Sequence, residues 1–226
     1  MTRTIIVTGG ASGLGAAVVD LLQTGGDTPI VFDRTEPAVD VDHELVDVAD
    51  RAAAEAAVTR AVQRAGGLDA VVTCAGVDSC GVLEDVPADD WEKVIKVNLL
   101  GTVAVVRAAI PELKKRHGHV VTVASTLGVR AVSDATAYCA SKFGVVGFTR
   151  ALAAETAGQV GVSLLLPGGM QTPFFDGRTE QYKPPPDAKL NRPQDVARAV
   201  LFALDQPSGC EVRELVVAPS IDSSWP

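Results

Sequence analysis

The stretch TGGASGLG, residues 8–15, follows an apolar run and precedes a helical pattern. The run Thr4–Val7 predicts a buried strand, and residues 14–24, apolar at helical spacing, predict an amphipathic helix. Glycine permits a tight turn between the two and lets a ligand approach the backbone closely. The N-terminus of the helix presents N–H groups and a dipole that favour an anion. We therefore expect a phosphate site here, although glycines at such a turn can also be purely structural. The residues expected to form it are Gly9, Ser12, Gly13, Leu14 and Gly15.

Strand-like and helical segments alternate along the rest of the chain. Several apolar runs are continuous, which is typical of parallel strands covered on both faces. Alternating strands and helices imply right-handed βαβ connections, so the predicted fold class is α/β. We expect a Rossmann-type, doubly wound parallel β-sheet of about seven strands with helices on both faces. No linker divides the chain, so residues 1–226 are expected to form a single domain. The expected strands are Thr4–Val7, Pro29–Phe32, Glu44–Val46, Ala70–Cys74, Val120–Ala124, Val162–Leu166 and Glu214–Val217, and the expected helices span residues 14–24, 50–65, 88–115, 136–157 and 193–204.

Composition restricts the class of protein and its partners. The 226 residues are 47% hydrophobic and 21% charged, which favours a packed globular protein over a disordered one. A net charge of −8 argues against nucleic acid or an anionic membrane surface as a partner. The four cysteines show no CxxC spacing and do not cluster with the three histidines, so we expect reduced thiols and no metal site.

The sequence shows no signal for export or membrane insertion. It enters the first expected strand almost at once, without a signal peptide. The apolar segment Val97–Ile110 is too short to cross a bilayer, which takes roughly 20 residues. A soluble, cytoplasmic protein is expected.

Three polar side chains suit acid–base chemistry. Tyr138 and Lys142 are four residues apart in an expected helix and therefore share a face. A tyrosine with an ordinary pKa of about 10 exchanges protons poorly at neutral pH, and a neighbouring ammonium favours the phenolate. Ser125, at the end of the preceding expected strand, can hydrogen-bond a substrate oxygen. The simpler alternative is an ordinary amphipathic pair on the helix.

Several motifs occur together and in one order: TGGASGLG, Asn98 in VNLLG, Ser125 in VTVAST, Tyr138 and Lys142 in AYCASK, and PGGMQTP at residues 167–173. In this combination the chain resembles the short-chain dehydrogenase/reductase family over essentially its whole length. The resemblance implies an NAD(P)-dependent oxidoreductase that transfers a hydride between a nicotinamide cofactor and a secondary alcohol or ketone. Tyr138 would act as general acid/base, Lys142 would lower its pKa, and Ser125 would orient the substrate oxygen.

The resemblance also implies further roles for individual residues. Lys142 would hold the nicotinamide ribose, and Asn98 would anchor a water in a proton relay, unless Asn98 is only a helix cap. Thr172 would contact the nicotinamide carboxamide, unless it is only a turn residue. The other cofactor contacts implied are Asp47 and Val48 at the adenine, Cys74, Ala75 and Gly76 at the adenosine ribose, and Tyr138, Pro167 and Gly168.

The chain departs from the family pattern at one place. The family usually has two asparagines before the Ala-Gly of the fourth strand, where this chain has Thr73 and Cys74. The first asparagine usually links the central strands. Its replacement puts local stability and adenosine packing in question more than hydride transfer.

Asp33 and Arg34 bear on the choice of cofactor. Asp33 ends the second expected strand, where a carboxylate can accept from both adenosine ribose hydroxyls and repel a 2′-phosphate. Its simpler alternative is an exposed acid at a strand end. Arg34 should point the other way, and in this family an arginine after the acid can stack on adenine. We expect NAD as the cofactor, with NADP less favoured.

The segment 173–192 is the irregular part of the chain. Its three consecutive prolines exclude a regular helix, and a long loop in a compact domain is usually functional or disordered. Phe174, Phe175 and Tyr182 would form an apolar wall on a substrate-binding lid that closes on binding, unless the phenylalanines pack in the core. The segments Val77–Gly81 and Leu127–Arg130 are also expected to reach the substrate.

Two expected helices are apolar over more than one stripe, VNLLGTVAVVRAAI at residues 97–110 and KFGVVGFTRALAAE at residues 142–155. One face must cover the sheet, so the remaining apolar surface calls for a second partner. The family commonly assembles through these two helices. A homodimer or homotetramer is expected, acting on a small-molecule alcohol or ketone.

Two other classes of function compete with this interpretation. The chain could bind the cofactor and serve as a regulatory or scaffolding protein with little turnover, which the intact Ser125, Tyr138 and Lys142 oppose. It could also be another Rossmann-type binder such as a methyltransferase, which leaves those three residues unexplained.

Overall fold

The computed structural model describes residues 2–207 and 209–222, and seven of its segments form one parallel β-sheet. The strand order is β3-β2-β1-β4-β5-β6-β7. The expected fold class is confirmed, and each expected strand is present within two residues at either end. The strands are β1 (Thr4–Thr8), β2 (Thr28–Asp33), β3 (Asp42–Leu45), β4 (Ala70–Thr73), β5 (His119–Val123), β6 (Gly161–Pro167) and β7 (Glu214–Val217).

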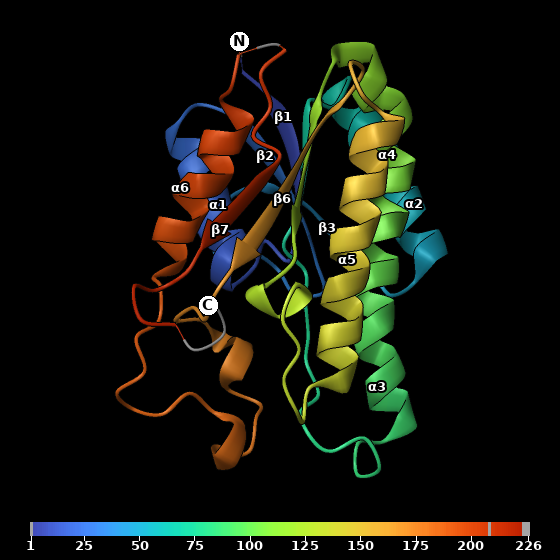
Figure 1. Ribbon diagram of the computed structural model, residues 1–226. Coiled ribbons are helices and arrows are strands. Elements are labelled where there is room, and N and C mark those ends of the chain that lie inside the picture. The colour runs from blue at the N-terminus through green and yellow to red at the C-terminus, as the bar shows by residue number, and fades with distance from the viewer. Residues whose placement is uncertain (1, 208, 223–226) are drawn as a thin grey trace.

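Helices cover both faces of this sheet (Figure 1). α1 packs against α6 on one face, whereas α2, α4 and α5 lie on the other. The continuous apolar runs follow from this arrangement: in β1, Ile6 belongs to the core beneath α2 and α4, while Ile5 and Val7 belong to the core beneath α1 and α6. The helices are α1 (Gly13–Thr24), α2 (Arg51–Ala65), α3 (Ala88–Ile95), α4 (Thr102–Arg116), α5 (Thr136–Glu155) and α6 (Pro193–Leu204).

The helix expected over residues 88–115 has the right extent but is not regular. A π-helical turn, Lys96–Gly101, separates α3 from α4 and contains Asn98. Gly101 lies close to Val48, where a Cβ would approach the valine Cγ2 to 2.8 Å. The wider turn thus joins two helical segments while Asn98 is buried and the backbone packs against the loop after β3. Such π turns often occur at functional sites.

This helical span also corrects the expectation about its length. Ala88–Arg116 comprises 29 residues with a mean hydropathy of 1.6 in its most apolar window, which is long and apolar enough to cross a membrane. Half of that window is buried inside the fold. A core helix packed on a sheet meets the same criteria, so this is weak evidence for a membrane span.

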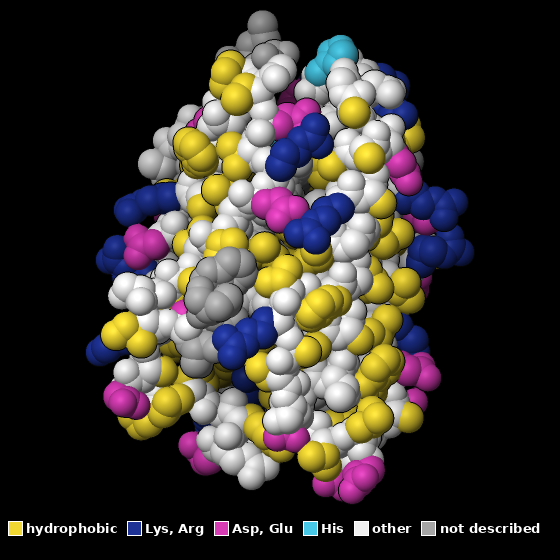
Figure 2. Space-filling view, viewed as in Figure 1, with side chains coloured by type: hydrophobic (Ala, Val, Ile, Leu, Met, Phe, Trp, Pro, Cys, Tyr) yellow, Lys and Arg dark blue, Asp and Glu magenta, His cyan; other side chains and the backbone are white. Residues whose placement is uncertain are grey.

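Apolar side chains are exposed on the side of the molecule where this helical span and α5 lie. Figure 2 shows hydrophobic side chains gathered where Figure 1 places α5 and α3. Leu100, in the π turn, and Phe143, on α5, are 52% and 44% exposed. The two helices therefore bury one apolar face against the sheet and present further apolar surface to solvent.

The sheet brings the loops that line the cavity to one edge, at the carboxyl ends of its strands. Strand order reverses on either side of β1, whose neighbours are β2 and β4. In open parallel sheets, ligands bind at the carboxyl ends of the strands beside such a switch point. The turn after β1 and the loops after β2, β4, β5 and β6 meet there.

Thr73, at the end of β4, is a buried hydroxyl without a hydrogen-bond partner among the described residues. Its register partners on both sides are threonines, and both are bonded. Thr8 Oγ1 accepts from the Ala75 N–H at 3.1 Å, and Thr122 Oγ1 is 2.7 Å from Thr149 Oγ1. Thr73 therefore does not provide the link between central strands that the family's asparagine usually provides.

Thr73→Val should raise the free energy of unfolding by about 1 kcal/mol, because it removes an unsatisfied buried hydroxyl and keeps the branched shape. Thr122→Val is the matched control on the neighbouring strand, and it should lower stability by about 1 kcal/mol through loss of a made hydrogen bond. Urea unfolding at equilibrium measures both. Equal destabilisation by the two substitutions would show that the Thr73 hydroxyl is satisfied in solution.

Candidate active site

A cavity of about 1130 Å³ opens at the carboxyl ends of the strands. It exceeds the usual range of roughly 300–1000 Å³ for a small-molecule site, so it has room for a large ligand and a second, smaller one. Every residue expected to contact a cofactor lines it, from Gly9 in the first turn to Thr172 after β6. Ser125, Phe174, Phe175 and Tyr182 line it as well. The sequence therefore predicted the residues of one continuous cavity.

The glycine turn leaves no room for side chains. A Cβ at Gly15 would lie 2.1 Å from the Gly9 carbonyl oxygen, and a Cβ at Gly9, where φ is +68°, would lie 2.8 Å from Ala75 N. Ser12 precedes α1 without making a side-chain capping hydrogen bond within the described structure, and the first turn of α1 contains no acid. The N-terminus of α1 is thus left for an external anion, and the turn fits a pyrophosphate.

Asp33 is held in a fixed position at the end of β2. One carboxylate oxygen accepts from the Ala11 N–H at 3.1 Å, and the other accepts from the N–H groups of Arg34 and Thr35 at 2.7 and 3.2 Å. The acid is thereby joined to the glycine turn. Arg34 is exposed at the cavity edge. Together with the glycine turn and the N-terminus of α1, Asp33 makes the site suitable for a dinucleotide.

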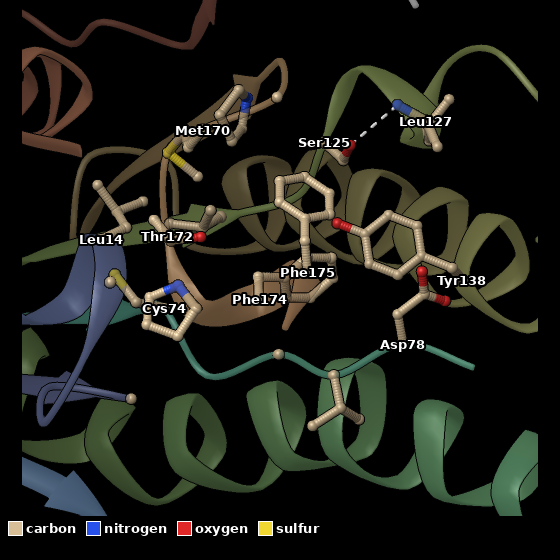
Figure 3. A pocket seen from close by; sticks show the side chains of 18 of the residues that line it. Leu14, Cys74, Asp78, Ser125, Leu127, Tyr138, Met170, Thr172, Phe174 and Phe175 are labelled. Carbon is tan, nitrogen blue, oxygen red and sulfur yellow. Dashed lines mark hydrogen bonds between the residues drawn. The ribbon is translucent and has the colours of Figure 1, made fainter. Parts of the chain in front are cut away.

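Ser125 and Tyr138 both line the cavity (Figure 3). Ser125 follows β5 and caps a short 3₁₀ turn, its Oγ accepting from the Leu127 N–H at 3.1 Å. Tyr138, from the first turn of α5, lines the same cavity, and its hydroxyl is near enough to Ser125 for the serine to affect its pKa. The two hydroxyls are therefore presented side by side to a substrate oxygen.

The pKa of Tyr138 differs from the sequence-based expectation. Burial raises it above its ordinary value and outweighs the influence of Ser125, which acts in the opposite direction. The charge of Asp78 raises it further, whereas that of Arg178 lowers it. The expected lowering by Lys142 does not prevail in the protein alone, because desolvation of the phenolate is the larger effect.

Lys142 lies one helical turn beyond Tyr138, and its Nζ is 5.6 Å from the centre of the tyrosine ring. The ammonium is buried and donates to the Val123 carbonyl oxygen at 2.9 Å. Burial lowers the pKa of Lys142 to about 8. Lys142 can thus release or accept a proton near neutral pH.

Asn98 is buried and lies behind the cavity wall. Its Oδ1 accepts from the Val77 N–H at 2.8 Å, while its Nδ2 donates to the Val77 carbonyl oxygen and to Ser141 Oγ at 2.9 and 3.0 Å. A Cβ on Gly76 would lie 3.6 Å from Asn98 Oδ1 and 3.8 Å from Lys142 Nζ. Asn98 therefore fixes the loop after β4 against α5 and faces the same small space as Lys142.

The remaining expected contacts line the cavity from the loops after β3 and β6. Asp47 and Val48 lie after β3, and Pro167, Gly168 and Thr172 lie at the end of β6 and beyond. Thr172 is near the glycine turn, since a Cβ on Gly13 would be 3.4 Å from its side chain. These positions lie where the adenine and nicotinamide ends of one dinucleotide are expected.

Cys74 replaces the second family asparagine within the cavity. Burial raises the pKa of this thiol to about 12, so the thiol is neutral. It fills its place in the wall as a small apolar group.

The segment after β6 lines the cavity beside Tyr138. Two short 3₁₀ turns, Pro173–Phe175 and Glu180–Tyr182, interrupt an otherwise irregular chain, as its prolines predict. The Phe174 ring is 5.7 Å from the Tyr138 ring and packs edge-on against Phe175 at 5.5 Å. Both phenylalanines are half-buried at the cavity and lie outside the described hydrophobic cores. They line the cavity, as the sequence predicts, rather than packing in a hydrophobic core.

Two charged residues at the cavity were not predicted from the sequence. Asp78, after β4, and Arg178, in the segment after β6, form an ion pair of 2.5 Å at the cavity. The segments Val77–Gly81 and 173–191 were expected near the substrate, but nothing in the sequence pairs these two residues across 100 positions. Of the expected segment Leu127–Arg130, Leu127 lines the cavity.

Comparison with known proteins agrees with this geometry. Residues 3–183 match the short chain dehydrogenase family. An uncharacterized oxidoreductase of Staphylococcus aureus is 34% identical over 95% of this chain and 96% of its own. The 3-oxoacyl-(acyl-carrier-protein) reductase FabG of Thermotoga maritima is 32% identical over 88% and 89% of the two chains.

Solved structures share the fold. Ligand-free aldohexose dehydrogenase from Thermoplasma acidophilum superposes with a TM-score of 0.88 at 25% identity, covering 96% of this chain and 92% of that one. An alcohol dehydrogenase from Thermococcus sibiricus, solved with 5-hydroxy-NADP, has a TM-score of 0.87 at 24% identity and 96% coverage of each chain, which shows the fold alone.

The chain belongs to the short-chain dehydrogenase family. It is an oxidoreductase of the NAD(P)-dependent kind that acts on small molecules.

Proposed function

We propose that this enzyme transfers a hydride between NAD and a secondary alcohol or ketone, with Tyr138 as general acid/base. The observation that supports this most directly is that Ser125, Tyr138 and Lys142 line one cavity, with Lys142 one helical turn from Tyr138 and its Nζ 5.6 Å from the tyrosine ring. The glycine turn and Asp33 would hold the cofactor, which supplies the hydride acceptor or donor when bound.

The proton chemistry follows from the positions of the hydroxyl groups. In alcohol oxidation, the Tyr138 oxygen takes the hydroxyl proton of the substrate while the carbon loses its hydride, and a C=O double bond forms. Ser125 donates to the same substrate oxygen and stabilises its developing negative charge. In ketone reduction every transfer runs in reverse, and Tyr138 returns the proton. A general acid/base in this position contributes typically 10²–10⁴-fold to the rate.

Lys142 and Asn98 would return the proton to solvent. Lys142, with its pKa lowered to about 8, can exchange protons near neutral pH. Asn98 Oδ1 faces the same space beside Gly76. A relay from Tyr138 through Lys142 towards that space agrees with the arrangement.

NAD is the proposed cofactor because Asp33 is fixed at the end of β2. Its carboxylate is held by the Ala11 and Thr35 N–H groups, beside the place expected for the adenosine ribose. A 2′-phosphate there would meet like-charge repulsion, and residues 10–12 of the glycine turn supply no basic side chain. Arg34, at the cavity edge, would stack on adenine and leave some tolerance for NADP.

We further propose one domain with residues 173–192 as a substrate-binding lid, and a homodimer or homotetramer in the cytoplasm. The exposed Leu100 and Phe143 support assembly, since the π turn and α5 leave apolar surface to cover. The net charge of −8 favours small-molecule substrates over nucleic acid or a membrane surface.

Tyr138→Phe should lower kcat/KM by about 10³-fold, because the acid/base hydroxyl is lost while the ring is kept. The reaction is followed at 340 nm with NADH and NADPH against panels of ketones, keto esters, sugars and steroids. NADH binding, measured by fluorescence, should be retained, which shows that the variant is folded and forms the cofactor site. Retained turnover would remove Tyr138 from the chemistry, and absence of turnover in the parent enzyme would favour a regulatory protein.

Asp33→Ala should shift the ratio of kcat/KM for NAD and NADP towards NADP by about 10-fold or more, since one like-charge repulsion is removed. Thermal stability should be measured alongside, because Asp33 also holds the glycine turn. An unchanged ratio in a folded variant would show that another residue selects the cofactor.

Light scattering across a range of concentrations should give the mass of a dimer or tetramer. Phe143→Lys should then reduce the mass to that of a monomer, because it places a charge on the proposed apolar interface. A monomer mass in the parent protein at every concentration would contradict the proposed assembly.

A further inference from the structure

The ion pair between Asp78 and Arg178 joins two loops on opposite sides of the cavity. Arg178 Nη2 lies 2.5 Å from Asp78 Oδ2, and the two side chains are only 19% and 5% exposed. The guanidinium also donates to the Tyr182 carbonyl oxygen at 3.1 Å, within its own segment. Figure 3 shows Asp78 beside Tyr138 at the substrate end of the cavity. An ion pair so well covered differs from the exposed pairs on the rest of the surface.

The segment that contains Arg178 is a loop with a closed base. The Gln171 N–H donates to the Asn191 carbonyl oxygen, and the Asn191 N–H donates to the Gly169 carbonyl oxygen, both at 2.9 Å. Asn191 is in turn tied to β7 through the Val217 carbonyl oxygen at 3.0 Å. The two ends of the loop are therefore fixed, and its position over the cavity depends on contacts made between them.

Arg178 also packs against the rings of Phe174 and Phe175. Its guanidinium carbon is 5.2 Å from the centre of the Phe174 ring and 4.6 Å from that of Phe175. Phe174 in turn contacts the ring of Tyr138. A chain of contacts thus runs from Asp78 through Arg178 and Phe174 to the hydroxyl that performs the proposed proton transfer.

We propose that Asp78 and Arg178 form a clasp that closes the loop of residues 171–191 over the substrate and positions Phe174 against Tyr138. Both are positioning residues, and the proposal rests on the proposed function insofar as the cavity beside Tyr138 is taken as the substrate pocket.

The clasp is built so that it can open. In two other ion pairs the arginine donates through both Nε and Nη2, Arg3 to Asp27 and Arg60 to Glu44. Arg178 uses Nη2 alone on Asp78, and its buried Nε has no partner among the described residues. The second oxygen of Asp78 already accepts from the Ser79 N–H at 2.7 Å. A guanidinium that binds a carboxylate through one nitrogen holds the loop less firmly than one that binds through two. The loop can therefore open, as entry of substrate requires.

The two charges of the clasp act on Tyr138 in opposite directions. The described groups that face this hydroxyl are Asp78, Arg178 in the loop, and Cys139 and Lys142 on α5. Asp78 raises the pKa of Tyr138 and Arg178 lowers it. Removing one charge or the other should therefore move the ionisation of Tyr138 in opposite senses, which mere loosening of a loop would not do.

Limited proteolysis with chymotrypsin tests closure without any substrate. Cleavage after Phe174, Phe175 or Tyr182 requires the loop to open, so its rate follows the open population. Asp78→Asn and Arg178→Gln should each accelerate cleavage by about tenfold, and the double variant should add little, since both singles break the same pair. Arg192→Gln breaks an exposed pair beside the loop and should leave the rate unchanged. Parent-like cleavage in both clasp variants would overturn the proposal.

The pH profile of alcohol oxidation supplies the second readout. The rate rises with pH as Tyr138 ionises, so the rise should move to lower pH in Asp78→Asn and to higher pH in Arg178→Gln, each by about 0.5 pH unit. Shifts in the same sense would overturn the positioning role. If no substrate is turned over by the parent enzyme, proteolysis still decides whether the clasp exists, so failure of the proposed function and failure of the clasp are distinguishable.

Discussion

The backbone of Gly15 lies against the carbonyl group of Gly9, and the position of the site depends on this contact. Any Cβ at Gly15 would overlap that oxygen. Because the two segments approach so closely, α1 begins directly above the end of β1 and packs along α6. Gly9 also touches the backbone at Ala75, so the turn after β1 meets the turn after β4 on the two sides of the switch point. The cavity opens where these turns meet, and no side chain fits at Gly9 or Gly15.

Much of this could be predicted from the sequence, because the information is local. β1 is a continuous apolar run because Ile5 and Ile6 face two different cores, and a glycine turn separates it from the helix that follows. Tyr138 and Lys142 share a face by helical spacing alone, and their closeness to Ser125 follows once β5 and α5 are placed. The cavity lining follows from the same rule, that parallel strands bring their carboxyl ends to one edge.

The features that could not be predicted depend on contacts between distant parts of the chain. The π turn at Lys96–Gly101 fits the close approach of Gly101 to Val48, which no helical pattern in residues 88–116 reveals. Thr73 lies between two hydrogen-bonded threonines of the sheet, and only the structure shows that its own hydroxyl has no partner among the described residues. Asp78 and Arg178 look like ordinary loop charges until the loop folds over the cavity.

Burial sets the protonation state of the site in the protein alone. It raises the pKa of Tyr138 and lowers that of Lys142, because desolvation opposes a phenolate and an ammonium alike. The same burial makes any charge that arrives in the cavity act more strongly. We infer that the tyrosine stays neutral until a positive charge, such as that of an oxidised nicotinamide ring, lies beside it. Acid–base chemistry would then be confined to the loaded enzyme, and the charges of Asp78 and Arg178, one opposing the phenolate and one favouring it, would set how readily Tyr138 ionises there.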